Sequence, residues 1–231
     1  IDDQELKKLV PKIYNKNFLT YGFSKTANFQ ILKPIYRKDH SIFNLKISVP
    51  GSKNKTVKEI KLNLIGQYNI LNSVAAIALC LHIGVSIKVI KNSLKKFTGI
   101  QRRLTKVFSI NGREFFDDYA HHPTEIKSVL KSLRTTSANR KIISVFQPHR
   151  YSRLKLLKND FSSSFKDSDL VILCPVYAAG EKIDKKYNSE KFAKLISQNS
   201  KVQVIIVGDE YDLKKFFIKN LLKNEIIVCM G

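Results

Sequence analysis

The sequence predicts an α/β protein whose second half is built on a doubly wound parallel sheet. Four continuous apolar runs lie after residue 140, and each is typical of a buried strand: KIISVF, DLVILC, VQVIIVG and EIIVCM. Helical segments near residues 151–165, 188–198 and 211–222 separate these runs. Buried strands that alternate with helices are typical of parallel sheets with helices packed on their faces.

The first hundred residues follow a different pattern. DDQELKKLV is typical of a short helix with an acidic first turn. The short runs FLTYGF, NFQILKPIY, SIFNLKISV and VKEIKLNLI predict antiparallel strands or hairpins. From Asn69 the pattern becomes helical and ends at Gly84, and Ser86 is expected to cap a second helix, IKVIKNSLKKF.

A predicted linker, TGIQRRL, separates these two parts of the chain. After it, TKVFSI-NG-REFFDD predicts a hairpin with a turn at Asn111 and Gly112. We therefore predict two domains, residues 1–103 and 104–231. The helix predicted after DDYAHHP carries four apolar residues on one face: Ile126, Val129, Leu130 and Leu133.

The net charge of +22 allows two interpretations. A basic chain can bind nucleic acid through its phosphates. The alternative is a Lys-rich surface, since the positive charge is spread along the chain without an Arg-rich tract or an aromatic–basic stacking motif. We favour the second interpretation and predict no nucleic-acid partner.

Cysteine spacing and hydropathy indicate a reducing, cytoplasmic setting. The three Cys residues are far apart in apolar runs and form no metal-binding spacing, so we predict no metal ligands. No apolar run approaches the roughly 20 residues that span a bilayer, and no signal peptide is visible, so we predict no membrane partner. The chain lacks an initial Met and stops after a strand-like run, and we expect it to be a fragment.

Three polar clusters follow three of the predicted strands. DDYAHHPTE comes after REFF, QPHRYSR after KIISVF, and PVYAAGE after LVILC. Ligands bind beyond the carboxyl ends of the strands in doubly wound sheets. Each cluster alone can be a structural loop, but three at one sheet edge predict a binding site.

The first cluster stands at a predicted helix N-terminus, because Pro123 suits the first helical position. Asp118 can accept hydrogen bonds from sugar hydroxyls and Tyr119 can stack on a base. His121 or His122 can contact a substrate. The alternative is that the Asp and His side chains only cap the helix and bond to each other.

The second cluster contains Arg150 and Arg153, which lie on one face if this segment is helical. Paired guanidinium groups bind carboxylate or phosphate through forked hydrogen bonds, and the alternative is a solvated basic face. We interpret His149 as structural, holding the turn.

Two further pairs are candidates for nucleotide contact. Asn69 and Asn72 begin the predicted helix of small residues, where Asn can recognise an adenine edge or cap the helix. Arg102 and Arg103 lie at the predicted domain junction, where they can reach a phosphate or bridge the domains. The chain contains no GxxxxGK[ST] phosphate loop, and we can place no Ser-His-Asp signature.

These motifs together resemble the Mur ligases. GQYNILNSVAA, GIQRRL, DDYAHHPTEI, FQPHRYSR and YAAGE occur in that family's order between residues 66 and 181, and DDYAHHPTE joined to QPHRYSR is specific. The chain departs from the family pattern at Tyr68, where His is usual, and at Leu104, where Phe is usual. The resemblance implies the end of a central ATPase domain followed by a Rossmann-like C-terminal domain.

The resemblance also implies the chemistry of cell-wall precursor synthesis in the cytoplasm. ATP, with Mg²⁺, would phosphorylate the carboxylate of UDP-N-acetylmuramate, and the amine of L-alanine would attack the acyl phosphate to form an amide. Because the phosphate loop, metal ligands and UDP-binding domain lie outside this sequence, we expect the chain alone to be inactive.

The resemblance assigns roles to the candidate residues. Asn72 and Tyr119 would contact adenine, and Asp118 would contact the ribose. Arg102 or Arg103 would approach the nucleotide from the linker. The amino-acid side of the site would be formed by three residues whose arginines hold the alanine carboxylate: His121, Arg150 and Arg153.

Two alternatives to this function stay open. One is the related ligase that recycles murein peptides, which shares much of the first motif. The other is a non-catalytic Rossmann-like module that binds nucleotide or RNA through its basic surface. The sequence indicates no particular oligomeric state.

Overall fold

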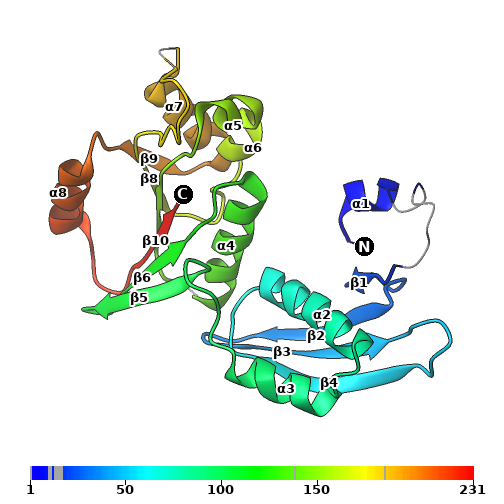
Figure 1. Cartoon of the computed structure of the whole chain (residues 1–231). Helices are drawn as coiled ribbons and strands as arrows, with labels where there is room; N and C mark the ends of the chain where they lie inside the picture. The colour runs from blue at the N-terminus through cyan, green and yellow to red at the C-terminus, as the bar shows by residue number, and fades with distance from the viewer. Residues whose placement is uncertain (1, 10–11, 13–17, 138, 185) are drawn as a thin grey trace. The chain divides into compact units, whose positions relative to one another are not determined.

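The chain forms two compact units, Ile1–Gly99 and Ile100–Gly231 (Figure 1). The computed structural model describes residues 2–9, 12, 18–137, 139–184 and 186–231. Within these residues, no helix has both the length and the apolar character needed to cross a bilayer.

The first unit is a four-stranded sheet with helices. The expected short helix near the start is confirmed, as is the helix that begins near Asn69. Its elements are α1 (Gln4–Leu9), β1 (Tyr21–Gly22), β2 (Phe29–Tyr36), β3 (Ser41–Ile47), β4 (Lys55–Leu62), α2 (Gln67–His82) and α3 (Ile87–Lys96).

Strands β2, β3 and β4 pair antiparallel, as expected from their alternating pattern. The expectation of an antiparallel strand is wrong for FLTYGF, because its two-residue strand β1 pairs parallel with β2. The intervening loop explains the difference, since it turns back far enough to place Thr20 beside Asn28. The Asn28 side chain accepts hydrogen bonds from the backbone N–H and the hydroxyl of Thr20, each at 2.9 Å.

The core of the first unit lies between the sheet and helices α2 and α3. Alternate residues of β3, including Phe43 and Leu45, are fully buried and pack with Ile70 of α2 and Ile90 of α3. The predicted cap is confirmed, because the Ser86 hydroxyl accepts a hydrogen bond from the Val89 N–H at the start of α3.

The second unit contains the predicted parallel sheet. The segment predicted as a helix near residues 151–165 forms two short helices. The elements are β5 (Thr105–Ile110), β6 (Arg113–Asp118), α4 (Pro123–Thr136), β7 (Ile142–Phe146), α5 (Tyr151–Leu156), α6 (Lys158–Ser162), β8 (Leu170–Leu173), α7 (Ser189–Ser200), β9 (Gln203–Ile206), α8 (Glu210–Asn220) and β10 (Ile226–Met230).

The strand order in this sheet is β5-β6-β10-β7-β8-β9. All neighbours pair parallel except β5, which forms the expected hairpin with β6. Asn111 and Gly112 both have positive φ in its turn, as a two-residue hairpin requires. Strand β9 is an edge strand and only partly buried, so the expectation that it is fully buried is wrong.

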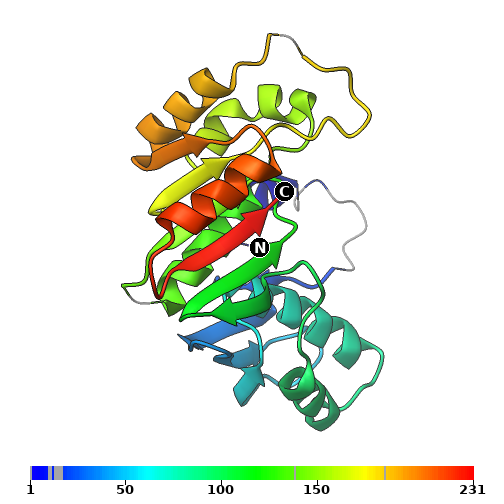
Figure 2. The same ribbon diagram turned by 90° about the vertical axis from the view of Figure 1, so that its left-hand side faces the viewer.

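Helices cover both faces of the sheet (Figure 2). On one face, Ile143 and Val145 of β7 contribute to a core that includes Phe216 of α8. On the other face, Phe146 packs against Phe161 of α6. Helix α4 lies on this second face, and all four apolar residues predicted for it are buried, which confirms that prediction. The carboxyl ends of β6, β7, β8 and β10 therefore meet at one edge of the sheet.

Candidate functional site

Loops from three strand ends meet in one row of aromatic rings. Tyr119 and His121 follow β6, His149 follows β7, and Tyr177 follows β8. Ring centroids are 4.9 Å apart between Tyr119 and His121, 6.0 Å between His121 and His149, and 5.2 Å between His149 and Tyr177. The structure thus brings the three polar clusters of the sequence together.

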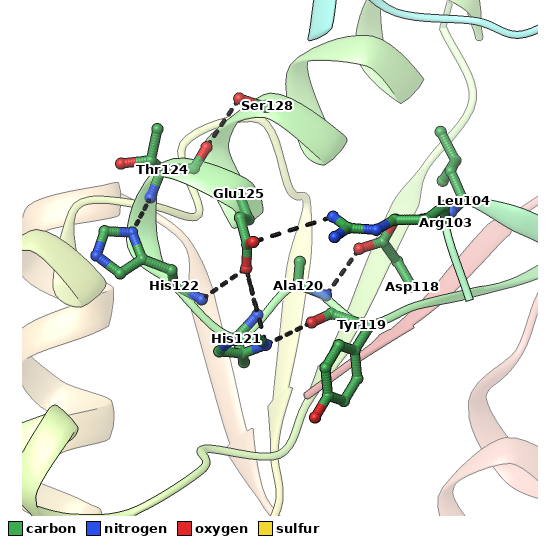
Figure 3. A network of polar contacts seen from close by, with 10 residues as sticks. All are labelled: Arg103, Leu104, Asp118, Tyr119, Ala120, His121, His122, Thr124, Glu125 and Ser128. Atoms are coloured by element: carbon green, nitrogen blue, oxygen red, sulfur yellow. Dashed lines mark hydrogen bonds and ion pairs between the residues drawn. The ribbon is translucent and has the colours of Figure 1, made fainter. Parts of the chain in front are cut away.

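Asp118 lies at the end of β6, and its side chain is buried, with 2% of the residue exposed (Figure 3). One carboxylate oxygen accepts a hydrogen bond from the Leu104 N–H and the other from the Ala120 N–H, both at 2.7 Å. Burial raises the pKa of Asp118 to about 6, although the two N–H groups favour the ionised form. The carboxylate therefore ties the linker before β5 to the loop after β6.

The two histidines of this loop differ in their roles (Figure 3). His122 caps α4, since its Nδ1 accepts a hydrogen bond from the Thr124 N–H, and Glu125 accepts from the His121 and His122 N–H groups in return. Pro123 occupies the expected first helical position. The His121 ring lies 3.8 Å from the Glu125 carboxylate through Nδ1, but its hydrogen bond is to the Tyr119 carbonyl, so the interpretation that the imidazoles cap the helix holds for His122.

The hydrogen bond of the His121 ring defines its tautomer. Nδ1 lies 2.8 Å from the Tyr119 carbonyl oxygen, which can only accept. Nδ1 therefore carries a hydrogen, and in the neutral ring Nε2 is the acceptor. The ring is partly exposed and its Nε2 is suited to contact a ligand.

The linker arginines lie against the same loop. The Arg102 guanidinium is 4.4 Å from the centroid of the Tyr119 ring, and Arg102 Nη2 donates to the Gly231 carbonyl at 3.2 Å. Arg103 Nη1 lies 3.9 Å from Glu125 Oε1. The Tyr119 N–H donates to the Arg102 carbonyl at 2.9 Å, so backbone and side-chain contacts both join the linker to the loop.

A cavity of about 450 Å³ opens at this sheet edge, on the side covered by α8. The cavity is lined by the ends of β6, β7, β8 and β10 and by the start of α8. Arg102, a predicted nucleotide-contacting residue, also lines it. Parallel sheets place ligands in this position.

The loop after β7 carries the two arginines of the second cluster. Helix α5 begins at Tyr151, and Arg150 precedes it as the N-cap with a φ of 71°. The expectation that Arg150 and Arg153 share one face of a helix is therefore wrong, because Arg150 lies outside the helix in a left-handed conformation. Arg153 Nη1 is buried and has no hydrogen-bond partner among the described residues.

His149 also belongs to this site, beyond the structural role interpreted from the sequence. Its backbone does bridge to Tyr177, which holds the turn. Its ring, however, lies between His121 and Tyr177, and within the described part of the chain its buried Nδ1 has no hydrogen-bond partner. Burial, together with the charge of Arg153, lowers the pKa of His149 below its ordinary value. The sequence signal for this role is its position next to Arg150 in a strand-end loop.

Asn69 and Asn72 lie in the first unit, on α2. The Asn69 amide donates a hydrogen bond to the Ile65 carbonyl at 2.8 Å, whereas Asn72 is exposed. Helix α2 begins at Gln67, so Asn69 falls in its first turn and Asn72 in its second. Among the residues that the structure describes, no three His, Cys, Asp or Glu side chains gather to hold a metal ion.

Two protein-family models match this chain, and so do several named proteins. Residues 102–231 match the family model described as the Mur ligase glutamate ligase domain, and residues 1–80 match the Mur ligase middle domain. A protein of Pelagibacter ubique named UDP-N-acetylmuramate–L-alanine ligase is 48% identical over 231 residues, which cover this whole chain and 50% of that protein.

Two further matches agree with these. A Brachyspira hyodysenteriae protein of the same name is 44% identical over 180 residues, which cover 78% of this chain and 38% of that protein. The crystal structure of a UDP-N-acetylmuramate-alanine ligase from Thermotoga maritima has the same fold, with a TM-score of 0.71 at 24% identity, and the match covers 92% of this chain and 44% of that one. The chain thus spans half or less of the length of these relatives.

Proposed function

Because the chain belongs to the Mur ligase family, we propose that it forms part of an ATP-dependent ligase that joins L-alanine to the carboxylate of UDP-N-acetylmuramate. The names of its relatives from Pelagibacter ubique and Brachyspira hyodysenteriae support this substrate pair. The reaction would supply a peptidoglycan precursor in the cytoplasm, where ATP is available.

The observation that carries the proposal is the buried guanidinium nitrogen of Arg153, which has no hydrogen-bond partner among the described residues and lies near enough to His149 for its charge to act on that ring. A buried donor without a partner costs free energy unless a ligand satisfies it. A carboxylate is the matching acceptor, since guanidinium groups bind carboxylates through forked hydrogen bonds. We therefore assign Arg153 and Arg150 to the alanine carboxylate, which leaves the amine free to attack.

The histidines would shape the remainder of the amino-acid pocket. His149 is neutral at pH 7 because its pKa is lowered, so its ring adds no positive charge that would repel the alanine ammonium group. The Nε2 of His121 is an acceptor in the neutral ring and can receive a hydrogen bond from that group. The rings of Tyr119 and Tyr177 close the two ends of the row.

The nucleotide side of the site is assigned to aromatic, basic, amide and carboxylate side chains. Tyr119 is 39% exposed, and Arg102 lies over its ring, so together they offer an aromatic and cationic surface to a base. We assign Arg103 to a phosphate, and Asn69 and Asn72 of the first unit to adenine. Asp118 is assigned to the ribose, although it is buried and each of its oxygens already accepts a backbone hydrogen bond, so a ribose hydroxyl would have to donate to a remaining lone pair. When bound, ATP supplies the phosphoryl group that activates the muramate carboxylate.

The described residues do not fit a magnesium site. They contain no cluster of three metal-binding side chains, and the sequence contains no GxxxxGK[ST] loop. We expect the Mg²⁺ ligands and the phosphate loop in other parts of the full-length enzyme. The 231 residues alone are therefore expected to be inactive.

The test is a phosphate-release assay on the full-length enzyme with ATP and UDP-N-acetylmuramate. L-alanine, serine, glycine and the murein tripeptide are offered separately. We expect L-alanine to give the highest kcat/KM. A preference for the tripeptide would instead indicate the recycling ligase. If none of the four compounds causes phosphate release, the chain belongs to a non-catalytic binding module.

A further inference from the structure

We propose that Glu181 is a positioning residue that holds Arg150 and Arg153 in place for the amino-acid carboxylate, an assignment that rests on the proposed function. Glu181 lies in the loop after β8, whereas both arginines lie in the loop after β7 and the start of α5. Its carboxylate contacts Ser152, which lies between the two arginines in the sequence.

Helix α5 depends on an external cap. It has only six residues, and its N-cap residue, Arg150, makes no side-chain hydrogen bond to the helix. Glu181 Oε2 accepts a hydrogen bond from the Ser152 N–H at 3.1 Å, and Glu181 Oε1 accepts one from the Ser152 hydroxyl. A helix this short is marginal by itself, so a carboxylate on its first turn stabilises the start from which both arginines extend.

The backbone of the β8 loop directs Glu181 to that helix end. Ala179 and Gly180 both have positive φ, 51° and 85°, and the Glu181 N–H donates to the Ala178 carbonyl at 3.1 Å, which closes a tight turn. Gly180 suits this turn because a residue with a Cβ is strained at such a φ.

The same loop is joined to the β7 loop through its backbone. The Tyr177 N–H donates to the Pro148 carbonyl at 2.8 Å, and the Arg150 N–H donates to the Tyr177 carbonyl at 2.9 Å. The two loops are therefore held together at both ends, by the backbone before Arg150 and by Glu181 after it. The left-handed φ of Arg150, which is unfavourable for a non-glycine residue, is maintained between these two attachments.

Charge supports the same role. The two hydrogen bonds from Ser152 and the nearby Arg150 lower the pKa of Glu181, so the carboxylate is ionised throughout the neutral range. Glu181 is partly exposed and its loop is at the sheet edge, away from the apolar core. Removal of its carboxylate is thus expected to affect the arginines rather than the fold.

The test compares Glu181→Ala, Glu181→Gln and Ser152→Ala in the full-length enzyme. We expect Glu181→Ala to raise the KM for L-alanine about tenfold, the effect of losing one helix cap, with the KM for ATP changed less than about twofold. Glu181→Gln retains an acceptor oxygen and is expected to recover part of the loss. Adding Ser152→Ala to Glu181→Ala should cause little further loss, because Glu181→Ala already removes the hydrogen bond of the Ser152 hydroxyl. Glu190→Ala, which removes an exposed carboxylate from α7, is the control and should leave both KM values unchanged.

Hydrogen exchange of the same proteins separates this proposal from the proposed function. Glu181→Ala should speed deuterium uptake in residues 150–156, and Glu190→Ala should not. Unchanged exchange, or equal increases in the KM for L-alanine and for ATP, would overturn the positioning role. If the wild-type enzyme releases no phosphate with L-alanine, the proposed function fails, and faster exchange then still supports the contact but not its link to alanine.

Discussion

The buried carboxylate of Asp118 makes the stability of the second unit depend on pH in a predictable way. Replacing Asp118 with Asn keeps the shape of the side chain but removes the titrating group. The Asn amide retains one oxygen acceptor, and its NH₂ group then faces one of the two N–H donors, from Leu104 or Ala120. The absolute change in stability therefore combines a lost hydrogen bond with relief from a buried charge, whereas the pH dependence isolates the charge.

The magnitude follows from the raised pKa of Asp118, which is about 6 in the fold against an ordinary 3.8. Because the folded pKa is the higher one, the stabilisation from this carboxyl is complete below 3.8 and is lost as the pH rises through 6. Integrating the proton uptake from pH 7.5 to pH 5.0 gives about 1.4 kcal/mol in favour of the wild-type fold. The Asp118→Asn protein has no such titration at this position.

The assay is urea unfolding followed by circular dichroism, for the wild-type chain and Asp118→Asn, at pH 7.5 and pH 5.0. Other titrating groups are common to both proteins, so they cancel in the difference between the two. We expect the free energy of unfolding of the wild type, relative to Asp118→Asn, to increase by about 1.4 kcal/mol at the lower pH. A difference that is the same at both pH values would refute a raised pKa at Asp118.

Three other substitutions test the opposite end of the sheet. Arg140→Ala removes the ion pair with the buried Glu114 and the hydrogen bonds to the Gly112, Asn224 and Glu225 carbonyls, so we expect a loss of about 3 kcal/mol in urea unfolding. Lys106→Ala, which removes a half-exposed partner of the same carboxylate, should cost less, and equal losses would count against the assignment. Gly112→Ala places a Cβ on a residue with a φ of 77°, so we expect the thermal midpoint to fall by an amount equivalent to about 1 kcal/mol. An unchanged midpoint would show that the hairpin turn relaxes at no cost.

The strand and helix pattern of the second unit is predictable because it follows local rules. The alternation of apolar strands and helices specifies the parallel sheet, and Asn111-Gly112 specifies its hairpin. Pro123 marks the start of α4 for a local reason, since it lacks the N–H that a first-turn residue leaves unpaired. The gathering of three strand-end loops at one edge also follows from the parallel sheet.

The features that were not predictable depend on tertiary contacts. Arg150 leaves the helical pattern because the loop after β8 holds its backbone, and nothing in QPHRYSR indicates that contact. The Nδ1 atom of His149 is buried by neighbouring elements and has no hydrogen-bond partner among the described residues, which the local sequence does not indicate. The central position of β10, between β6 and β7, depends on pairing between strands that are far apart in the sequence. The parallel β1 likewise depends on a side chain, that of Asn28, from beyond the strand.

The most direct test of an amino-acid site at Arg153 is whether Arg153→Ala in the full-length enzyme impairs the use of L-alanine but not the use of ATP. Loss of one charge-assisted contact to the alanine carboxylate is expected to lower kcat/KM for L-alanine by about 10- to 100-fold. The KM for ATP should change less than about twofold. Lys155→Ala, on the same short helix, should leave kcat/KM for L-alanine and the KM for ATP unchanged. Equal losses for L-alanine and ATP, or no loss for either, would contradict an amino-acid site built on this arginine.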